Sequence, residues 1–543
     1  MKKQYYVILT VAAILLSGCQ MKKAATDIVK AEVDIVKDGV NFIKDNATSK
    51  KEKETKAEKT EKTEESSAEV EKNEQQEKNI AQIQVGFTYD YKGEWNDSIR
   101  KQILTAQNTN IHVLNDGYDL LNHALENWNE ENFETIYGYY QSTLPSAREL
   151  AADGVNVEWM LNRDIVVTRA DENILSFWND HDDYLGGAHG GYYRFGENFD
   201  SKTGNLLTLR EVVTDYDKFY ETFLNELMEA NNPEIFFEGW EDVVKAMFEN
   251  ETKNDGNELE WIMDQNGVTV CLNPYAIAPW AAGRLDVKVS FDEYPELFKT
   301  EYIVHEESKV TPLVERGTIT LGDGEKLSFY CERETNSFDN KISISKEKNG
   351  TTVTLSRDVY GEISKAYVIE NEDGKEYLYA EFSSENDYCT LEVFDLGENF
   401  CYVGTAEASF FNLPMTNAET FALCKRINLL GTYTGYKTYQ IGADGLPVSD
   451  DLDFKILNLR DTFVYELKTI RDLNVKIVDG KEEVIPAGTG MKIMQTDGIS
   501  YALMKLSDGR VCELSITKAE NQYEWLIDGI SEYECFEMLP YAG

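Results

Sequence analysis

The residues with the greatest chemical potential lie in one short stretch, Asp183 to Tyr193, which reads Asp-Tyr-Leu-Gly-Gly-Ala-His-Gly-Gly-Tyr-Tyr. It holds four glycines, three tyrosines and one of the five histidines of the chain. Glycine is favoured where the backbone takes positive φ or where another group approaches closely. We therefore expect a tight backbone around the imidazole of His189, which makes this ring the foremost candidate for a functional group.

Two kinds of chemistry are open to His189. It is a candidate general base, or a metal ligand together with His181, and the carboxylates that would orient it or share the metal are Asp182, Asp183, Glu197 and Asp200. The two histidines lack the helical spacing of a zinc protease motif. The alternative is a structural histidine, hydrogen-bonded inside a glycine-rich turn. We expect the structural role, and predict no metal site and no cofactor.

The charge of the chain restricts its partners. Lysine and arginine number 53 against 98 acidic residues, a net charge of −45. The range 83–305 alone carries 15 basic and 41 acidic residues, a net of −26. Such a surface repels nucleic acid and attracts cationic partners with a salt-dependent rate. The alternative, which stays open, is that the acidic surface serves only to keep the protein soluble.

The first nineteen residues predict export. Lys2 and Lys3 precede an apolar run from Tyr5 to Leu16, which is short for a membrane-spanning helix and typical of a signal peptide. The run ends in Leu16-Ser17-Gly18-Cys19, which resembles the lipobox of bacterial lipoproteins. That resemblance implies lipidation of Cys19 and anchoring at the extracellular face of the bacterial membrane. An ordinary secretory signal is the alternative.

Two further segments separate this anchor from the globular part of the chain. Residues 20–47 predict a short amphipathic helix with heptad spacing, because Val29, Val33, Val36, Val40 and Ile43 fall in one seam. Residues 48–82 are dominated by charged and polar side chains. A segment with so little to bury predicts a disordered spacer.

The range 83–305 predicts an α+β domain. We expect strands near 83–91, 155–169 and 174–179, a helical stretch over 108–150, and a second helical pair over 208–249 that begins with a Thr208/Glu211 capping box. The second helix of that pair, 233–249, would pack Ile235 into the core. Residues 261–272 predict a hairpin that turns at Asn266-Gly267.

Several motifs in this range carry a family resemblance. They are Arg169-Ala170-Asp171, Ile174-Leu175-Ser176, the Tyr184–Gly190 stretch, Asn198-Phe199-Asp200, Leu207-Thr208-Leu209 and the segment Asn273 to Gly283. Together they resemble the extracellular domain that ends the RsiV anti-sigma factor, a domain of unknown function that also accompanies peptidoglycan deacetylases.

This resemblance implies a ligand-binding role. In RsiV the domain is a receptor for lysozyme, and the acidic balance of the present chain suits a cationic ligand of that kind; cell-wall fragments such as peptidoglycan are the other expected ligand. A wall-modifying enzyme that uses His189 is the alternative function. The expected binding residues are Tyr184, Gly186, Gly187, His189, Gly190, Tyr192, Tyr193, Asn273, Pro274, Tyr275 and Trp280.

Beyond residue 309 the pattern becomes all-β. Short alternating segments about ten residues apart predict a sandwich over 310–425. Residues 426–543 predict a second all-β region, in which the turns between 474 and 516 resemble a bacterial SH3-like module. Cys389 and Cys401 are expected to face each other across a hairpin.

Overall fold

The computed structural model describes residues 81–542, apart from 252–258, 305–307, 323, 334–336, 385–387, 411–412, 459–464, 479 and 521–523. The predicted lipidation site at Cys19, the heptad helix and nearly all of the spacer lie outside these residues. Within the described ranges, no helix is both long and apolar enough to cross a membrane. Residues Asn79–Gly543 form one compact unit.

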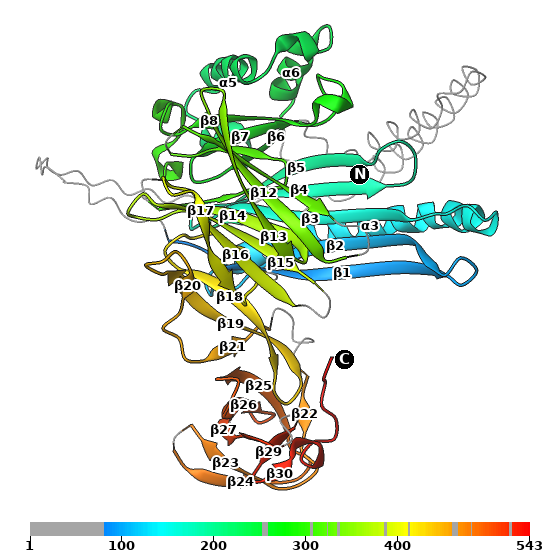
Figure 1. Ribbon diagram of the computed structural model, residues 1–543, viewed down its shortest axis with the longest axis vertical. Coiled ribbons are helices and arrows are strands. Elements are labelled where there is room, and N and C mark those ends of the chain that lie inside the picture. The colour runs from blue at the N-terminus through cyan, green and yellow to red at the C-terminus, as the bar shows by residue number, and fades with distance from the viewer. Residues whose placement is uncertain are drawn as a thin grey trace, which may run out of the picture. The chain divides into compact units, whose positions relative to one another are not determined.

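A five-stranded sheet organises the first part of this unit (Figure 1). Its strands follow the order of the chain: β1 (Val85–Asn96), β2 (Lys101–Val113), β3 (Trp159–Ala170), β4 (Ile174–Tyr184) and β5 (Gly191–Asp200). All neighbours are antiparallel except β2 and β3. A parallel pair needs a crossover connection, and the 34-residue helix α3 (Asp119–Ala152) provides it.

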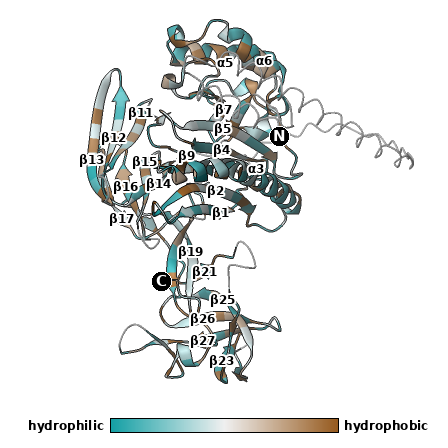
Figure 2. Ribbon diagram, turned by 90° about the vertical axis from the view of Figure 1, so that its right-hand side faces the viewer, coloured by the Kyte–Doolittle hydropathy of each residue, from teal (hydrophilic) through white to brown (hydrophobic). Residues whose placement is uncertain are grey.

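The sheet has two differently covered faces, because successive side chains of a strand point to opposite sides. Helix α3 lies along one face (Figure 2). There the side-chain amide of Asn129 accepts from Ile111 N (3.0 Å) and donates to Ile111 O (2.9 Å), and Trp128 packs edge-on against Phe177. The opposite face meets a β-sandwich, which places Lys365 within 4.7 Å of the Phe87 ring.

The prediction of a helical stretch over 108–150 was wrong at its N-terminal end. Residues up to Val113 belong to β2, which pairs with β1 along its whole length, and α3 begins only at Asp119. The polar run Asn108-Thr109-Asn110 hides the strand from a hydrophobicity pattern, because Asn108 and Asn110 are buried and bonded to each other (3.0 Å). A prediction from the spacing of apolar residues misses a strand whose buried positions are polar.

A helical layer and a small sheet complete the α+β part. The elements are α4 (Leu209–Val212), α5 (Tyr216–Ala230), η1 (Pro233–Ile235), α6 (Trp240–Glu249), β6 (Glu260–Met263), β7 (Gly267–Leu272) and β8 (Leu285–Ser290). The Thr208/Glu211 capping box is confirmed. Phe219, Phe223 and Phe248 pack in the core with the inner side chains of β7 and β8.

The second predicted helix of this layer was wrong at its beginning. It starts at Trp240 rather than residue 233, because Gly239 takes φ 80° and ends the preceding irregular segment. Ile235, expected in the core, is exposed.

The five-stranded sheet and the small sheet are locked together at Gly196. A Cβ added to Gly196 would lie 2.0 Å from Trp261 O, so β5 and β6 approach more closely than any side chain allows. Asn198 Nδ2 donates to Trp261 O (2.8 Å), and Ser176 Oγ accepts from Met263 N (2.9 Å). These contacts fix the position of β6 to β8 on the larger sheet.

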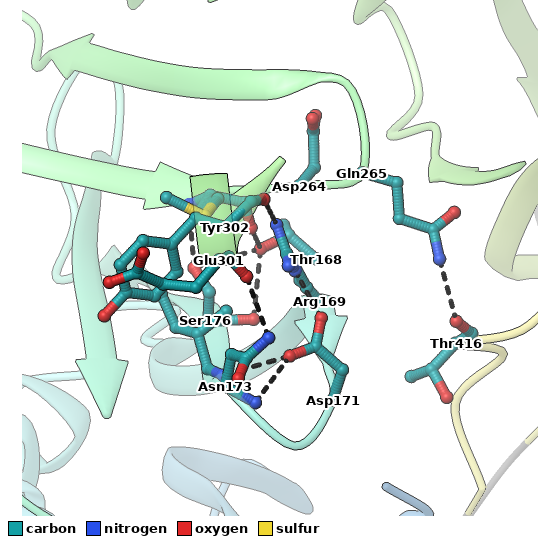
Figure 3. Close-up of polar contacts among 12 residues, drawn as sticks. Thr168, Arg169, Asp171, Asn173, Ser176, Asp264, Gln265, Glu301, Tyr302 and Thr416 are labelled. Carbon is teal, nitrogen blue, oxygen red and sulfur yellow. Dashed lines mark hydrogen bonds and ion pairs between the residues drawn. The ribbon is translucent and has the colours of Figure 1, made fainter. Parts of the chain in front are cut away.

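A polar group, here called the ionic anchor, joins the sheet to the end of the α+β part (Figure 3). It consists of Arg169, Asp171 and Asn173. Arg169 Nε lies 2.5 Å from Asp171 Oδ2, Arg169 Nη1 donates to Tyr302 O (2.6 Å), and Asn173 Nδ2 donates to Glu301 O (2.8 Å). Arg169 and Asp171 are each about 1% exposed along their side chains. The anchor therefore holds residues 301–302 against the β3–β4 turn.

Two antiparallel sheets follow. The first has the order β10-β11-β12-β13 and the second β17-β16-β15-β14-β9. The strands are β9 (Lys309–Pro312), β10 (Thr318–Thr320), β11 (Lys326–Arg333), β12 (Asp339–Lys348), β13 (Thr351–Tyr360), β14 (Glu362–Glu370), β15 (Glu376–Ser383), β16 (Cys389–Asp395) and β17 (Cys401–Ala406). Phe329, Ile344, Leu378 and Phe394 from both sheets share one core, as expected of a sandwich.

The expected facing of Cys389 and Cys401 was wrong. The register places Cys389 opposite Ser383 and Cys401 opposite Asp395, and no disulfide joins the two.

The last part of the chain is also all-β. Its main sheet contains β18 (Phe421–Asn428), β19 (Thr432–Ile441), β21 (Phe454–Ile456), β23 (Leu473–Ile477), β24 (Glu482–Ile485), β25 (Gly490–Thr496), β26 (Tyr501–Leu506) and β27 (Val511–Ser515), with β20 (Pro447–Val448) and β22 (Leu467–Lys468) at its side. A small sheet of β28 (Thr517–Lys518), β29 (Trp525–Ile527) and β30 (Ile530–Ser531) follows. The fold class, an α+β domain followed by all-β regions in a multi-domain chain, is confirmed.

Candidate functional site

The glycine-rich stretch forms the connection between β4 and β5. Tyr184 ends β4 and Gly191 begins β5. Gly186 and Gly187 take φ 85° and 96°, in the left-handed region that favours glycine. A Cβ on Gly190 would lie 2.8 Å from Asp183 O. Three glycines are therefore required by conformation or space, and the connection is as tight as the sequence predicts.

The second motif segment, Asn273 to Gly283, lies beside this connection. It runs from the end of β7 through η2 (Trp280–Ala282) to β8. The Asn273 side chain accepts from Arg194 N (2.8 Å) and donates to Arg194 O (2.8 Å). Asn273 thus occupies both backbone groups of a residue in β5, as a neighbouring strand would. This clip holds the two motif segments together.

His189 stacks on Trp280. Their ring centroids are 4.2 Å apart with an interplanar angle of 20°. His189 Nδ1 lies 2.9 Å from Gly190 O, and because a carbonyl only accepts, Nδ1 carries the proton. The imidazole is half-buried, whereas Trp280 keeps 38% of its surface exposed. The histidine therefore supports an exposed indole.

Tyr275 is exposed in a strained conformation. Its φ is 68°, its N–H donates to Ala278 O (3.1 Å), and 39% of its surface is accessible. The left-handed conformation costs a bulky L-residue about 1–2 kcal/mol. Such strain is concentrated at functional sites. A tyrosine that keeps its ring exposed at this strained position is a functional candidate.

Of the carboxylates expected near His189, Asp183 and Asp200 are bonded to other groups. Asp183 is buried on the α3 face and takes both Nη atoms of Arg163 (2.5 and 3.1 Å). Asp182, one residue earlier, projects to the opposite face. The carboxylate of Asp200 accepts from the backbone of Lys202 and Thr203 in the turn after β5.

The remaining candidate partners of His189 are Glu197 and His181. Glu197, on β5, lies opposite Phe177 of β4, and the His181 ring packs against the Phe195 ring with a centroid distance of 4.5 Å. The contacts described for His189 are the Gly190 carbonyl and the Trp280 ring. Among the described residues, no three or more His, Cys, Asp or Glu side chains are grouped to hold a metal ion. The residues proposed for catalysis are thus not brought together.

The predicted binding residues divide by exposure. Tyr184, Tyr275 and Trp280 are exposed, whereas Pro274 is buried. Tyr192 and Tyr193 are half-buried on opposite sides of β5, and Tyr192 lies under the guanidinium of Arg284 (4.3 Å). Burial raises the pKa of the Tyr192 and Tyr193 hydroxyls.

The sequence pattern missed one neighbour of this site. Phe237 is 42% exposed, and its N–H donates to Ile277 O (2.7 Å), so its exposed ring lies next to the second motif segment. The sequence did carry a signal for this position: Asn232-Pro233 and Gly239, on either side of Phe237, interrupt a helix. Tyr184, His189, Phe237, Tyr275 and Trp280 are called the aromatic surface below.

Comparison with known proteins finds a family match within the α+β part. Residues 209–292 match the family described as "Protein of unknown function (DUF3298)". A solved DUF3298 family structure from Bacteroides fragilis is 16% identical, with 41% of this chain and 96% of that chain covered and a TM-score of 0.31. One from Pseudomonas aeruginosa is 15% identical, with 42% and 99% covered and a TM-score of 0.29. No curated protein matches the chain.

Proposed function

We propose that this chain is a lipid-anchored extracellular protein whose α+β domain, residues 83–305, binds a cationic protein such as lysozyme through the aromatic surface. The observation that carries the proposal is the joining of two distant motif segments. The Asn273 clip and the His189–Trp280 stack join these two segments, which carry the exposed rings of Tyr184, Tyr275 and Trp280.

The chemistry of the surface favours a protein ligand. Tyrosine and tryptophan dominate the binding energy of protein interfaces, and exposed apolar rings beside one another mark interaction sites. The net charge of −26 over residues 83–305 favours encounter with a cationic partner and makes the association rate fall with salt. The resemblance to a lysozyme receptor domain supports the same ligand class.

The wall-modifying enzyme is the weaker alternative. It needs a carboxylate or metal to activate His189, whereas Asp183 is already held by Arg163 and the His189 ring is held by Trp280. No observation on the described residues favours this second function.

The test is calorimetric titration of the full chain with hen lysozyme at about 10 mM and 150 mM ionic strength. We expect a saturable complex that weakens with salt. Trp280→Ala should raise Kd roughly 30-fold, about 2 kcal/mol, as for an interface hot spot. Trp95→Ala is the matched control, since Trp95 is 53% exposed on β1 and bonds only the nearby Asp97.

Absence of binding at both salt concentrations would overturn the cationic-protein ligand. Equal binding by the Trp280 and Trp95 variants would overturn the assignment of the surface. Titration with soluble muropeptides identifies the other expected ligand class: binding of muropeptides without lysozyme would redirect the proposal to wall fragments.

The lipid anchor is tested separately. Growth with a radiolabelled or clickable palmitate analogue should label the native chain, and Cys19→Ser should abolish the label and release the protein from the membrane fraction. Unchanged fractionation of the Cys19→Ser protein would contradict the anchor.

A further inference from the structure

Strand β1 forms one edge of the five-stranded sheet. Among the described residues, β2 lies beside it and no strand pairs with its other side. Residues 85–88 are buried, but the half of β1 that leads into the hairpin with β2 is mostly exposed, along the border of the sheet in Figure 1. There Tyr91 and Trp95 keep 56% and 53% of their surfaces accessible. An edge of this kind offers its backbone groups to another strand.

The ladder with β2 decides which backbone groups of β1 point outward. Gln84 O accepts from Leu114 N (2.9 Å), so Gln84 directs its carbonyl toward β2. Backbone direction alternates along an antiparallel strand, and the register of β1 with β2 is regular as far as Glu94. The shift after Glu94 places the extra residue, Ile103, in β2, so the alternation continues along β1. Even-numbered residues of β1 therefore bond to β2, and odd-numbered residues direct their N–H and C=O groups outward.

The contacts of β2 support this assignment. Ile111 lies opposite Phe87, an odd-numbered residue of β1, and its backbone N–H and C=O bond to Asn129 of α3 rather than to β1. Among the described residues, no hydrogen bond reaches the outward backbone groups in the exposed half of β1. These outward groups belong to Tyr91, Gly93 and Trp95.

The exposed segment Tyr91-Lys92-Gly93-Glu94-Trp95 is complementary to itself about its central glycine. Two identical strands that pair about a two-fold axis run antiparallel, and each contact occurs twice. With Gly93 opposite Gly93 of a second copy, Lys92 lies opposite Glu94. The same register brings Tyr91 opposite Trp95. Opposite charges and aromatic rings in directly opposed positions both stabilise a pair of strands.

This register also satisfies the backbone. Odd-numbered residues face odd-numbered residues, so the outward N–H and C=O groups of Gly93 meet those of the second copy as a hydrogen-bonded pair. Lys92 and Glu94 then occupy non-hydrogen-bonded positions, where opposed side chains approach most closely. A side chain at the centre is excluded by the strand itself, because a Cβ on Gly93 would lie 2.9 Å from Tyr91 Oη.

Neighbouring registers are less favourable. A centre at Lys92 would place this lysine opposite itself, and a centre at Glu94 would do the same with two carboxylates; directly opposed like charges are destabilising. A centre at Tyr91 would bring Lys92 opposite Asp90. The Asp90 carboxylate is half-buried and already accepts from Asn110 Nδ2 (2.7 Å). The charges therefore favour the centre at Gly93.

Both charged side chains are accessible to a second copy. Lys92 is exposed, forms no ion pair with a described residue, and holds its Nζ 5.7 Å from the centre of the Tyr137 ring. Arg148 contacts Oε1 of Glu94 through Nε (2.7 Å) and Nη2 (2.6 Å). Both contacts use the same oxygen, so Oε2 of Glu94 can accept from Lys92 of a second copy.

We propose that two copies of this chain pair through β1, antiparallel and centred on Gly93, so that their five-stranded sheets join into one continuous sheet. The partner is a second copy rather than an unrelated extended peptide, because the same segment in the opposite direction supplies both the matching charges and the matching rings. Strand β1 and the β4–β5 connection lie at opposite edges of the sheet. The interface is therefore separate from the aromatic surface and does not rest on the proposed function.

The test is sedimentation velocity of the full chain at concentrations up to about 1 mM, which detects even a weak dimer. We expect a reversible monomer–dimer equilibrium. Lys92→Glu and Glu94→Lys each replace the opposite-charge pairs by like-charge pairs, and each should weaken the dimer at least tenfold, about 1.4 kcal/mol. Lys245→Glu makes the same charge change at an exposed site on α6 and should associate as the native chain does.

An equimolar mixture of the Lys92→Glu and Glu94→Lys proteins tests the register directly. In the mixed dimer an acidic side chain again lies opposite a basic one in both pairs, so the mixture should associate about as tightly as the native chain. Hydrogen exchange gives a second measurement: the outward amides of Tyr91 and Gly93 should exchange more slowly as the native chain associates.

Four outcomes would overturn the proposal. They are a native chain that stays monomeric, a Lys92→Glu protein that associates like the native chain, a mixture that associates no more tightly than either variant alone, and association that leaves exchange at Tyr91 and Gly93 unchanged. Lysozyme binding by Lys92→Glu should equal that of the native chain. Failure of this interface and failure of the proposed function therefore give different results.

Discussion

The ionic anchor and the aromatic surface belong to the same α+β domain, but they treat their chemical groups in opposite ways. The anchor buries Arg169 and Asp171 almost completely and pairs them with each other and with backbone groups. The aromatic surface leaves the rings of Tyr184, Tyr275 and Trp280 more than one third exposed. The contrast teaches that burial and the number of polar partners separate the framework from the proposed binding surface, even where both groups come from the same set of motif segments.

The largest expected effect comes from breaking the anchor. Arg169→Met leaves the Asp171 carboxylate buried without its cation, which should lower the free energy of unfolding by about 3–5 kcal/mol. Urea denaturation followed by tryptophan fluorescence measures it. Arg148→Met is the control, because the Arg148 side chain is 57% exposed and its pair with Glu94 should contribute below about 1 kcal/mol. Equal losses in the two variants would show that the anchor is not structural.

The next effect tests the close approach of the two sheets. Gly196→Ala forces a Cβ against Trp261 O, and such overpacking should cost about 1–3 kcal/mol. Gly138→Ala is the matched control, since Gly138 lies in α3 with open space around it and the change should stabilise the helix by up to about 1 kcal/mol. Circular dichroism melting of both variants gives the answer. A stable Gly196→Ala protein would contradict the locked geometry.

Local signals in the sequence predicted the framework well. The Thr208/Glu211 capping box, the Asn266-Gly267 turn and the glycine-rich connection each follow from backbone chemistry within a few residues, and each was found where expected. Alternating apolar patterns likewise predicted the all-β character beyond residue 309.

Long-range packing was beyond the sequence. Nothing near Asp182 and Asp183 says that one pairs with Arg163 and the other does not, because the pairing depends on which face α3 covers. Because Asn108 and Asn110 are polar although buried, the sequence pattern predicted the start of a helix where β2 lies. The Asn273 clip joins residues 79 positions apart, which no local pattern reveals.

A smaller effect separates strain from packing at the aromatic surface. Tyr275→Asn replaces a bulky residue at φ 68° with one that tolerates the left-handed region, so the free energy of unfolding should rise by up to about 1 kcal/mol. Lysozyme binding should weaken, because the exposed ring is lost. Paired urea denaturation and calorimetry measure both quantities. A variant that is less stable would show that Tyr275 is framework, and the contrast with the anchor would fail at this residue.

The smallest effect concerns Asp182, which belongs to neither group: it is half-buried, and no ion pair joins it to another of the described residues. Burial, and then the nearby Asp183 and Asp180 carboxylates, raise the pKa of Asp182 above its usual value of 3.8. A raised folded-state pKa means that ionised Asp182 opposes folding, so native stability is lost as the pH rises through that folded-state value. Asp182→Asn should therefore be more stable than the native chain at pH 8, by on the order of 0.5 kcal/mol once solvent screening is allowed for, and the difference should shrink as the pH falls toward 3.8.

Asp183→Asn is the control for this prediction, since it removes the buried partner of Arg163 and should destabilise the protein at both pH values. Urea denaturation of the three proteins at pH 8 and pH 5 gives the result; a stability difference for Asp182→Asn that grows toward pH 5 would reverse the sign and place Asp182 among the compensated framework carboxylates.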